Sequence, residues 1–176
     1  MIRITGGRLK GRTIREVPDK RTRYTSSIVR QALFNMVDVE GKSFLDLFCG
    51  SCAVLIEALS RGASFGAGVD VSGRAISICK VNLKELGLFE KVHLYKTDAV
   101  RFVKSPGMSF DVVFMDPPYK HDLASKVLKG MREDLVSDGG IVVVEERKGV
   151  EVFVPDFLEI VKERVYGDTK LVVMRK

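Results

Sequence analysis

The chain of 176 residues has no tryptophan, two histidines, three cysteines and no long apolar run, and these shortages exclude several protein classes. Three cysteines predict no disulfide framework. Cys49 and Cys52 have C-x-x-C spacing, but a structural zinc site would need two more ligands, and only the distant Cys79, His93 and His121 are available. We therefore expect neither a metal nor a redox role for this pair, and we expect Cys79, on an apolar helical face, to lie in the protein core. No segment approaches the roughly 20 apolar residues that cross a bilayer. With no signal core at the amino terminus, this predicts a cytoplasmic protein with no membrane partner.

Acidic residues are scarce at the amino-terminal end of the chain. The first 30 residues hold nine Lys and Arg but only Glu16 and Asp19 as acids, which puts the whole excess of the +6 net charge there. Such a basic arm attracts phosphate largely without regard to sequence. We expect it to bind nucleic acid, and the alternative is a solubilising terminus. The residues predicted to make these contacts are Arg3, Arg8, Lys10, Arg12 and Arg23.

Hydrophobic periodicity divides the chain into an extension, residues 1–40, and a domain, residues 41–176. The extension reads as a short basic β-ribbon followed by a helix, capped by Thr25, Ser26 or Ser27 and ending near residue 37. In the domain, strands are predicted at 43–48, 66–71, 92–95 and 110–115, and helices at 53–60, 73–86, 99–104 and 123–135. Gly139-Gly140 is predicted to turn into a strand at 141–144, and 157–165 with 169–174 to form an antiparallel hairpin. This pattern predicts an α/β, doubly wound, mostly parallel sheet.

Acidic side chains follow four consecutive predicted strands, at the sheet edge where such folds bind ligands. These are Asp46, Asp70, Asp98 and Asp116. Asp70 is placed to meet ribose hydroxyls, and Asp98 with Ala99 to meet an adenine ring. A full G-x-G-x-x-G and a Walker lysine are both lacking, which disfavours a polyphosphate. An adenosine with a positive charge, S-adenosylmethionine, fits these residues.

The stretch Asp116-Pro117-Pro118-Tyr119 is the most informative, because it ends a buried strand with a stiff turn. The two prolines lack N–H donors, so the turn offers hydrogen-bond acceptors only. Tyr119 adds a flat ring beside those acceptors. The turn suits a planar ring that carries an exocyclic amine, such as a nucleobase; the alternative is a structural proline turn.

Three segments together resemble one family, that of the RsmD 16S ribosomal RNA guanine-N2 methyltransferases. They are residues 3–12 (RITGGRLKGR), 23–35 (RYTSSIVRQALFN), and 46–63 (DLFCGSCAVLIEALSRGA) with Asp-Pro-Pro-Tyr. The sequence departs from the family at three positions. Cys52 stands where a second loop glycine is usual, Leu55 where another glycine is common, and Tyr24 where proline is common.

The resemblance implies a seven-stranded class I methyltransferase sheet and a role for each matching residue. Asp46, Phe48 and Gly50 would line the methionine side of the cofactor, with Thr25, Ser26 and Arg30 near its carboxylate. Asp70 and Val71 would hold the ribose, Asp98 and Ala99 the adenine. Catalysis would fall to Asp116, Pro117, Pro118 and Tyr119, acting on 16S ribosomal RNA or the small ribosomal subunit.

Two other functions stay open on the sequence. Adenine-N6 or other amino methylation of DNA or RNA shares the Asp-Pro-Pro-Tyr chemistry. A non-enzymatic RNA-binding protein without its cofactor is suggested by Cys52 and Leu55. Nothing in the sequence demands more than a monomer. Residues 145–148 (EERK) are expected to form a solvated strand end.

Overall fold

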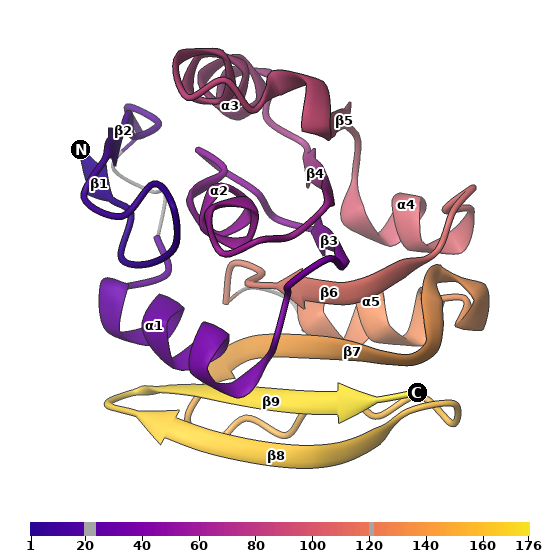
Figure 1. The fold of residues 1–176 in the computed structure, drawn as a ribbon. Coiled ribbons are helices and arrows are strands. Elements are labelled where there is room, and N and C mark those ends of the chain that lie inside the picture. Colours follow the sequence, from indigo (N-terminus) through magenta and orange to yellow (C-terminus); the bar gives the residue numbers. More distant parts are fainter. Residues whose placement is uncertain (20–23, 120–121) are drawn as a thin grey trace.

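The computed structural model describes residues 1–19, 24–119 and 122–176, and its centre is a seven-stranded sheet (Figure 1). Four strands expected from the sequence run parallel: β3 (Ser43–Asp46), β4 (Phe65–Asp70), β5 (Val92–Lys96) and β6 (Phe110–Met115). β7 (Val136–Arg147) also runs parallel to β6, and β9 (Thr169–Arg175) is antiparallel to both β7 and β8 (Glu159–Tyr166). The strand order is β5-β4-β3-β6-β7-β9-β8. The predicted fold class, with its antiparallel terminal hairpin, is confirmed.

The helices begin close to the predicted residues and most also end there, but the one predicted at 123–135 ends at Gly130, and residues 133–135 form a separate 3-10 turn. α1 (Ser27–Met36) begins after Ser26, whose hydroxyl accepts the Val29 N–H, and α2 (Ala53–Ser60) has the expected bounds. They are followed by α3 (Gly73–Glu85), α4 (Ala99–Lys104) and α5 (Leu123–Gly130). Two short 3-10 turns, η1 (Phe89–Lys91) and η2 (Glu133–Leu135), precede β5 and β7. In the part of the chain that the structure describes, no helix is long and apolar enough to cross a membrane.

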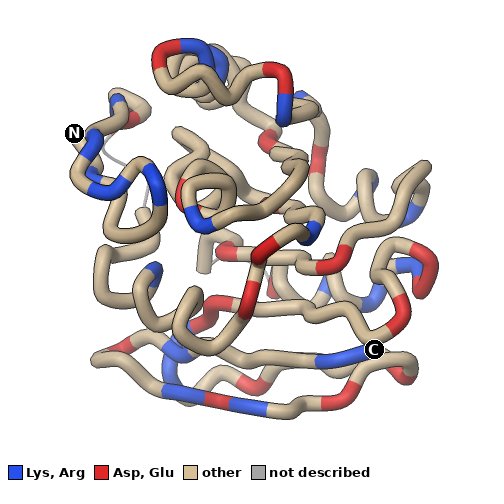
Figure 2. Tube along the Cα trace, viewed as in Figure 1, with Lys and Arg blue, Asp and Glu red and all other residues tan. Residues whose placement is uncertain are grey.

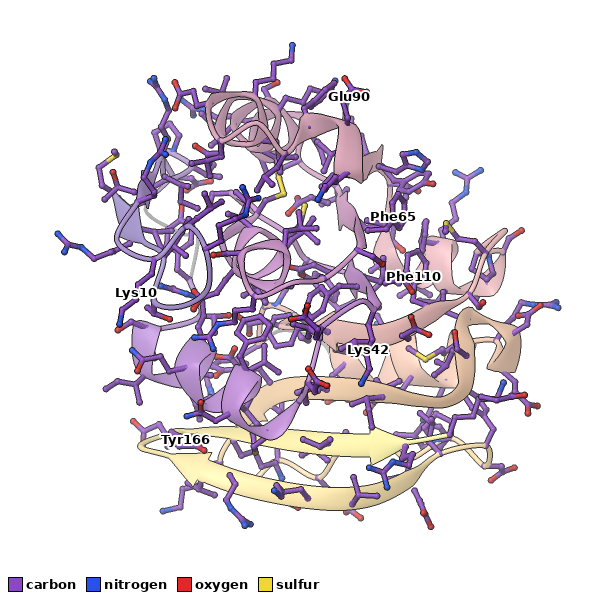
Figure 3. The ribbon with its side chains drawn as sticks, viewed as in Figure 1. Lys10, Lys42, Phe65, Glu90, Phe110 and Tyr166 are labelled. Atoms are coloured by element: carbon purple, nitrogen blue, oxygen red, sulfur yellow. A yellow bond between two sulfur atoms is a disulfide. The ribbon has the colours of Figure 1, made fainter. Side chains whose placement is uncertain are left out.

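Alternate residues of the central strands point into two apolar clusters, one on each face of the sheet. Phe44 and Phe114 belong to the cluster that contains α1, α2, α3 and the amino-terminal ribbon, β1 (Ile2–Arg3) and β2 (Thr13–Ile14). Leu45 and Phe110 belong to the cluster on the other face, which α4 and α5 cover (Figures 1 and 3). The ribbon is thus packed onto the sheet domain through shared core residues.

The structure corrects the prediction for the segment around β7. Gly139-Gly140 is not a turn before the strand, because β7 starts at Val136 and continues through both glycines. The register against β6 shifts there, between Phe110 and Val112, and Gly139 has a φ of 75°, which suits glycine. Of the predicted solvated residues 145–148, Arg147 and Lys148 are exposed as expected, but Glu145 and Glu146 are buried.

Candidate active site

Asp46 and Asp116 stand at the point where the strand order reverses. β3 lies between β4 and β6, so successive strands are added on one side of β3 and then on the other. Doubly wound folds bind ligands beyond the carboxyl end of the strand at which this order reverses. Asp46, the last residue of β3, pairs in register with Gly68 and Phe114, and Asp116 follows β6 directly. Asp46 is only 1% exposed. Burial, and then the charges of Asp116 and Asp70, raise the pKa of Asp46 to about 8.

The loop between β3 and α2 is fixed to the end of β4 by a carboxylate. Asp70 accepts the Gly50 N–H on one oxygen (2.9 Å) and the Ser72 N–H on the other (2.9 Å). Gly50 has a φ of 52°, and a Cβ built on it would meet nothing within 4 Å. The loop therefore borders open space at Gly50. We call residues 49–52 the cofactor loop, after the role that the sequence predicts for Gly50.

Three further predicted cofactor contacts, Val71, Asp98 and Ala99, lie just beyond the ends of β4 and β5. Val71 is 70% exposed directly after Asp70, which makes it an apolar surface beside a carboxylate. Asp98 is exposed, and its side chain accepts the Arg101 N–H (3.1 Å) as the cap of α4. Ala99 is buried as the first residue of that helix. Asp98 thus has a structural role in addition to any contact with a ligand.

Thr25 brings the amino-terminal extension to the Asp-Pro-Pro-Tyr turn. Its hydroxyl lies 3.2 Å from Asp116 Oδ2 and 3.0 Å from Glu145 Oε2. Glu145 is 2% exposed and comes one residue after Val144, the register partner of Met115. Sequence reasoning missed this residue because an acid in a charged run resembles a solvated strand end. Its position directly after a fully apolar strand was the available signal.

The remaining catalytic candidates form the turn after β6. Pro117 is buried, Pro118 is exposed and Tyr119 is half-buried. The Arg147 guanidinium lies over the Tyr119 ring, 4.7 Å from its centroid. The tyrosine therefore already accepts a planar group on one face. Arg147, at the end of β7, is a second residue of the site that the sequence did not reveal.

Two residues expected near the cofactor carboxylate have other partners. Ser26 caps α1. Arg30 is 3% exposed; it forms an ion pair with buried Glu57 (3.0 Å) and donates to the carbonyls of Thr25 and Arg3 (2.8 Å each). Its charge thus holds the extension against α2, leaving Thr25 as the member of this group that reaches Asp116.

The basic residues of the ribbon form a group at the amino-terminal end of the chain (Figure 2). The described members are Arg3, Arg8, Lys10 and Arg12, all exposed. Arg23 lies outside the described residues. The ribbon is anchored by its backbone instead, because the Arg8 N–H donates to Ser60 O (2.7 Å) and the Leu9 N–H to Ser60 Oγ (2.8 Å). The side chains are therefore left to face solvent.

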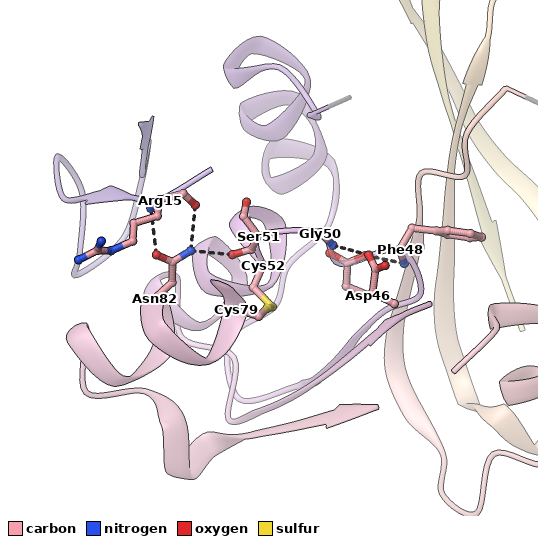
Figure 4. The surroundings of a disulfide bond; sticks show 9 residues. Arg15, Asp46, Phe48, Gly50, Ser51, Cys52, Cys79 and Asn82 are labelled. Atoms are coloured by element: carbon pink, nitrogen blue, oxygen red, sulfur yellow. Dashed lines mark hydrogen bonds between the residues drawn. A yellow bond between two sulfur atoms is a disulfide. The ribbon is translucent and has the colours of Figure 1, made fainter. Parts of the chain in front are cut away.

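The structure accommodates two of the three substitutions that depart from the family pattern, Leu55 and Cys52. Leu55 is fully buried against β4 at Gly66, where an added Cβ would lie 2.5 Å from Leu55 Cδ1. Cys52 takes a left-handed φ of 68° and forms a disulfide with Cys79 of α3 (Figure 4). The expectation that the cysteines form no disulfide is therefore wrong. The pairing joins residues 27 positions apart, and no local pattern encodes that.

Cys49 completes a group of three sulfurs that lie within 4.8 Å of one another. Burial, and then the charges of Asp46 and Asp70, raise the pKa of the Cys49 thiol well above its ordinary value. A thiol that stays protonated is a poor metal ligand. With the other two sulfurs joined, the group is better described as a disulfide beside a neutral thiol.

The fold and the acidic switch point define a class I methyltransferase of the S-adenosylmethionine-dependent type. The family model described as Conserved hypothetical protein 95 matches residues 2–175, and the chain belongs to that family. The resemblance to RsmD proteins is thereby confirmed.

Individual relatives cover nearly the whole chain. The ribosomal RNA small subunit methyltransferase D of Escherichia coli K12 is 31% identical over 173 residues, covering 94% of this chain and 85% of its own. YlbH of Bacillus subtilis, provisionally described as an rRNA methyltransferase, is 34% identical over 99% of both chains. A solved E. coli structure, provisionally described as methyltransferase yhhF, superposes with a TM-score of 0.88 at 27% identity, covering 99% of this chain and 97% of that one.

Proposed function

We propose that this protein transfers a methyl group from S-adenosylmethionine to the exocyclic N2 amine of a guanine in small-subunit ribosomal RNA. One observation carries the proposal: Asp46 ends β3 in register with Phe114 of β6, so the Asp-Pro-Pro-Tyr turn that follows β6 comes beside the cofactor-side acid. The methyl donor and the amine that receives the methyl group would therefore meet at this edge of the sheet. The named relative from E. coli supports ribosomal RNA as the substrate.

The residues present fit the cofactor. Its sulfonium supplies an electrophilic methyl group and a positive charge. A positive charge beside Asp46 would favour the ionised carboxylate, offsetting burial and the neighbouring carboxylates, which raise the pKa of this group. The open space at Gly50 would take the methionine portion, Asp70 the ribose, and exposed Val71 an apolar edge of the adenosine, with Asp98 and Ala99 at the adenine.

The turn after β6 would activate the guanine N2 amine, which is a poor nucleophile by itself. The guanine N2 lone pair is delocalised into its ring, and hydrogen bonds from the amine to Asp116 and the Pro117 carbonyl favour the pyramidal form that can attack. Tyr119 would stack on the extruded base, worth about 1–3 kcal/mol. Holding the two reactants in line removes several more kcal/mol of the barrier. The basic ribbon would hold the RNA backbone.

The test is methyl transfer to small ribosomal subunits from cells that lack this protein, with a labelled methyl donor and nucleoside analysis. We expect N2-methylguanosine; N6-methyladenosine would favour adenine methylation instead. Asp116→Ala should abolish transfer while S-adenosylhomocysteine binds within a few-fold of the parent affinity. Equal loss of binding and transfer would contradict the role of Asp116 in the transfer step, and absence of binding to the parent protein would favour a non-enzymatic RNA-binding protein.

A further inference from the structure

The cofactor loop contains a residue in a backbone conformation that its type disfavours. Cys52 has φ 68° and ψ 24°, and it precedes α2 without a side-chain hydrogen bond to the helix. The left-handed region is costly for any residue with a Cβ and easy for glycine. Such a residue keeps this conformation only when the surrounding structure enforces it.

The enforcing contacts come from one face of α3 (Figure 4). Cys79 is bonded to Cys52, with both side chains fully buried. One turn along the helix, the Asn82 amide donates to the Ser51 carbonyl (3.0 Å) and to the Arg15 carbonyl (3.0 Å), while its oxygen accepts the Arg15 N–H (2.9 Å). The cofactor loop is therefore held at two adjacent residues, and Asn82 ties it to the basic ribbon as well.

We propose that the Cys52–Cys79 disulfide is a redox-sensitive latch that holds the cofactor loop in its binding conformation. The bond enforces at Cys52 the left-handed conformation that a glycine would adopt without strain. The inference rests on the proposed function, because it concerns the affinity of that same cofactor site. Opening the latch takes two electrons and two protons from a dithiol, which becomes a cyclic disulfide, and leaves Cys52 and Cys79 as thiols. The loop then populates other conformations, and the apparent affinity for the cofactor becomes the intrinsic affinity multiplied by the fraction of molecules whose loop is still in the binding conformation.

Cys49 does not compete for the disulfide in the folded protein. Its sulfur lies within 4.8 Å of the other two, but burial and then Asp46 and Asp70 keep it a thiol, and exchange requires a thiolate. The latch thus has two states, closed between Cys52 and Cys79 or open.

Calorimetry with S-adenosylhomocysteine on the full chain tests the latch with two variants that break the same bond. Cys79→Ala leaves a non-glycine residue unsupported at position 52, and we expect its affinity to be about 5- to 30-fold weaker than that of the oxidised parent. Cys52→Gly loses the bond but tolerates the left-handed conformation, so its loss of affinity should be at least threefold smaller than that of Cys79→Ala. Dithiol treatment should weaken binding to the parent and leave both variants unchanged, whereas Cys49→Ala should keep the redox response.

Several outcomes would overturn the latch. Alkylation of the denatured, non-reduced chain should label one thiol per molecule, and three labelled thiols would show that the bond does not form. Equal affinities of Cys79→Ala and oxidised parent, in protein whose cooperative thermal unfolding shows that it is folded, would sink the inference but leave the proposed function standing. An oxidised parent that binds no S-adenosylhomocysteine would remove both.

Discussion

Replacing Asp46 with asparagine should make the protein more stable, and increasingly so as the pH rises. Asp46 accepts the Phe48 N–H (3.2 Å), a contact that an asparagine oxygen can keep, so Asp46→Asn mainly removes the ionisation. The folded-state pKa is about 8 against an ordinary 3.8, because burial first, and then Asp116 and Asp70, disfavour the charged form. Between these two values the folded state holds a proton that the unfolded state has released, so the wild type loses stability as the pH rises.

The magnitude follows from the size of the shift. Each unit of pKa difference corresponds to about 1.4 kcal/mol, so a shift from 3.8 to about 8 destabilises the wild type by on the order of 5 kcal/mol at alkaline pH. The free energy of unfolding of Asp46→Asn minus that of the wild type should increase with a slope approaching about 1.4 kcal/mol per pH unit between about pH 5 and pH 7. Above about pH 8 it should level off, because Asp46 is then ionised in both states.

The assay is urea unfolding of wild type and variant at several pH values, without reductant. Asp111→Asn is the matched control, because the Ser43 N–H (2.9 Å) lowers the pKa of Asp111. Asp111 stabilises the fold above its unfolded pKa, and that contribution disappears as the pH falls. The control should therefore be less stable than wild type at neutral pH, with the difference closing in acid. An Asp46→Asn advantage that does not change with pH would refute the reasoning.

Three further predictions concern other parts of the chain. Reducing the disulfide should lower the free energy of unfolding by about 3–4 kcal/mol, because it closes a loop between residues 27 apart; a denaturation midpoint unaffected by dithiol would contradict this. Arg30→Ala should cost about 3 kcal/mol by leaving Glu57 buried with less compensation, whereas Arg15→Ala, which opens an exposed pair with Glu85, should cost under about 1 kcal/mol in the same experiment. Replacing Arg8, Lys10 and Arg12 together by alanine should reduce the salt dependence of RNA binding by a slope of up to about 3; an unchanged slope would place the RNA elsewhere, and alanines at Lys162 and Arg164 on β8 serve as the control.

Local sequence was sufficient for most of the fold. The bounds of α2 and α4 and the existence of every central strand follow from periodicity, because burial on one face of a helix or strand depends on residues a few positions apart. The 12-residue length of β7 did not follow, since a strand that passes through Gly139-Gly140 with a register shift has no local signature.

The candidate site divides in the same way. Acids at the ends of parallel strands could be predicted to meet, because those ends share one edge of the sheet, and Asp46 and Asp116 do influence each other. The proposal that Asp-Pro-Pro-Tyr binds an amine also came from the sequence alone. Only the tertiary structure paired Thr25 with Glu145 and Cys52 with Cys79, and set Arg147 over Tyr119. These contacts join residues 27 to 120 positions apart, and they depend on which strands become neighbours and how helices pack across them, which no short segment of chain specifies.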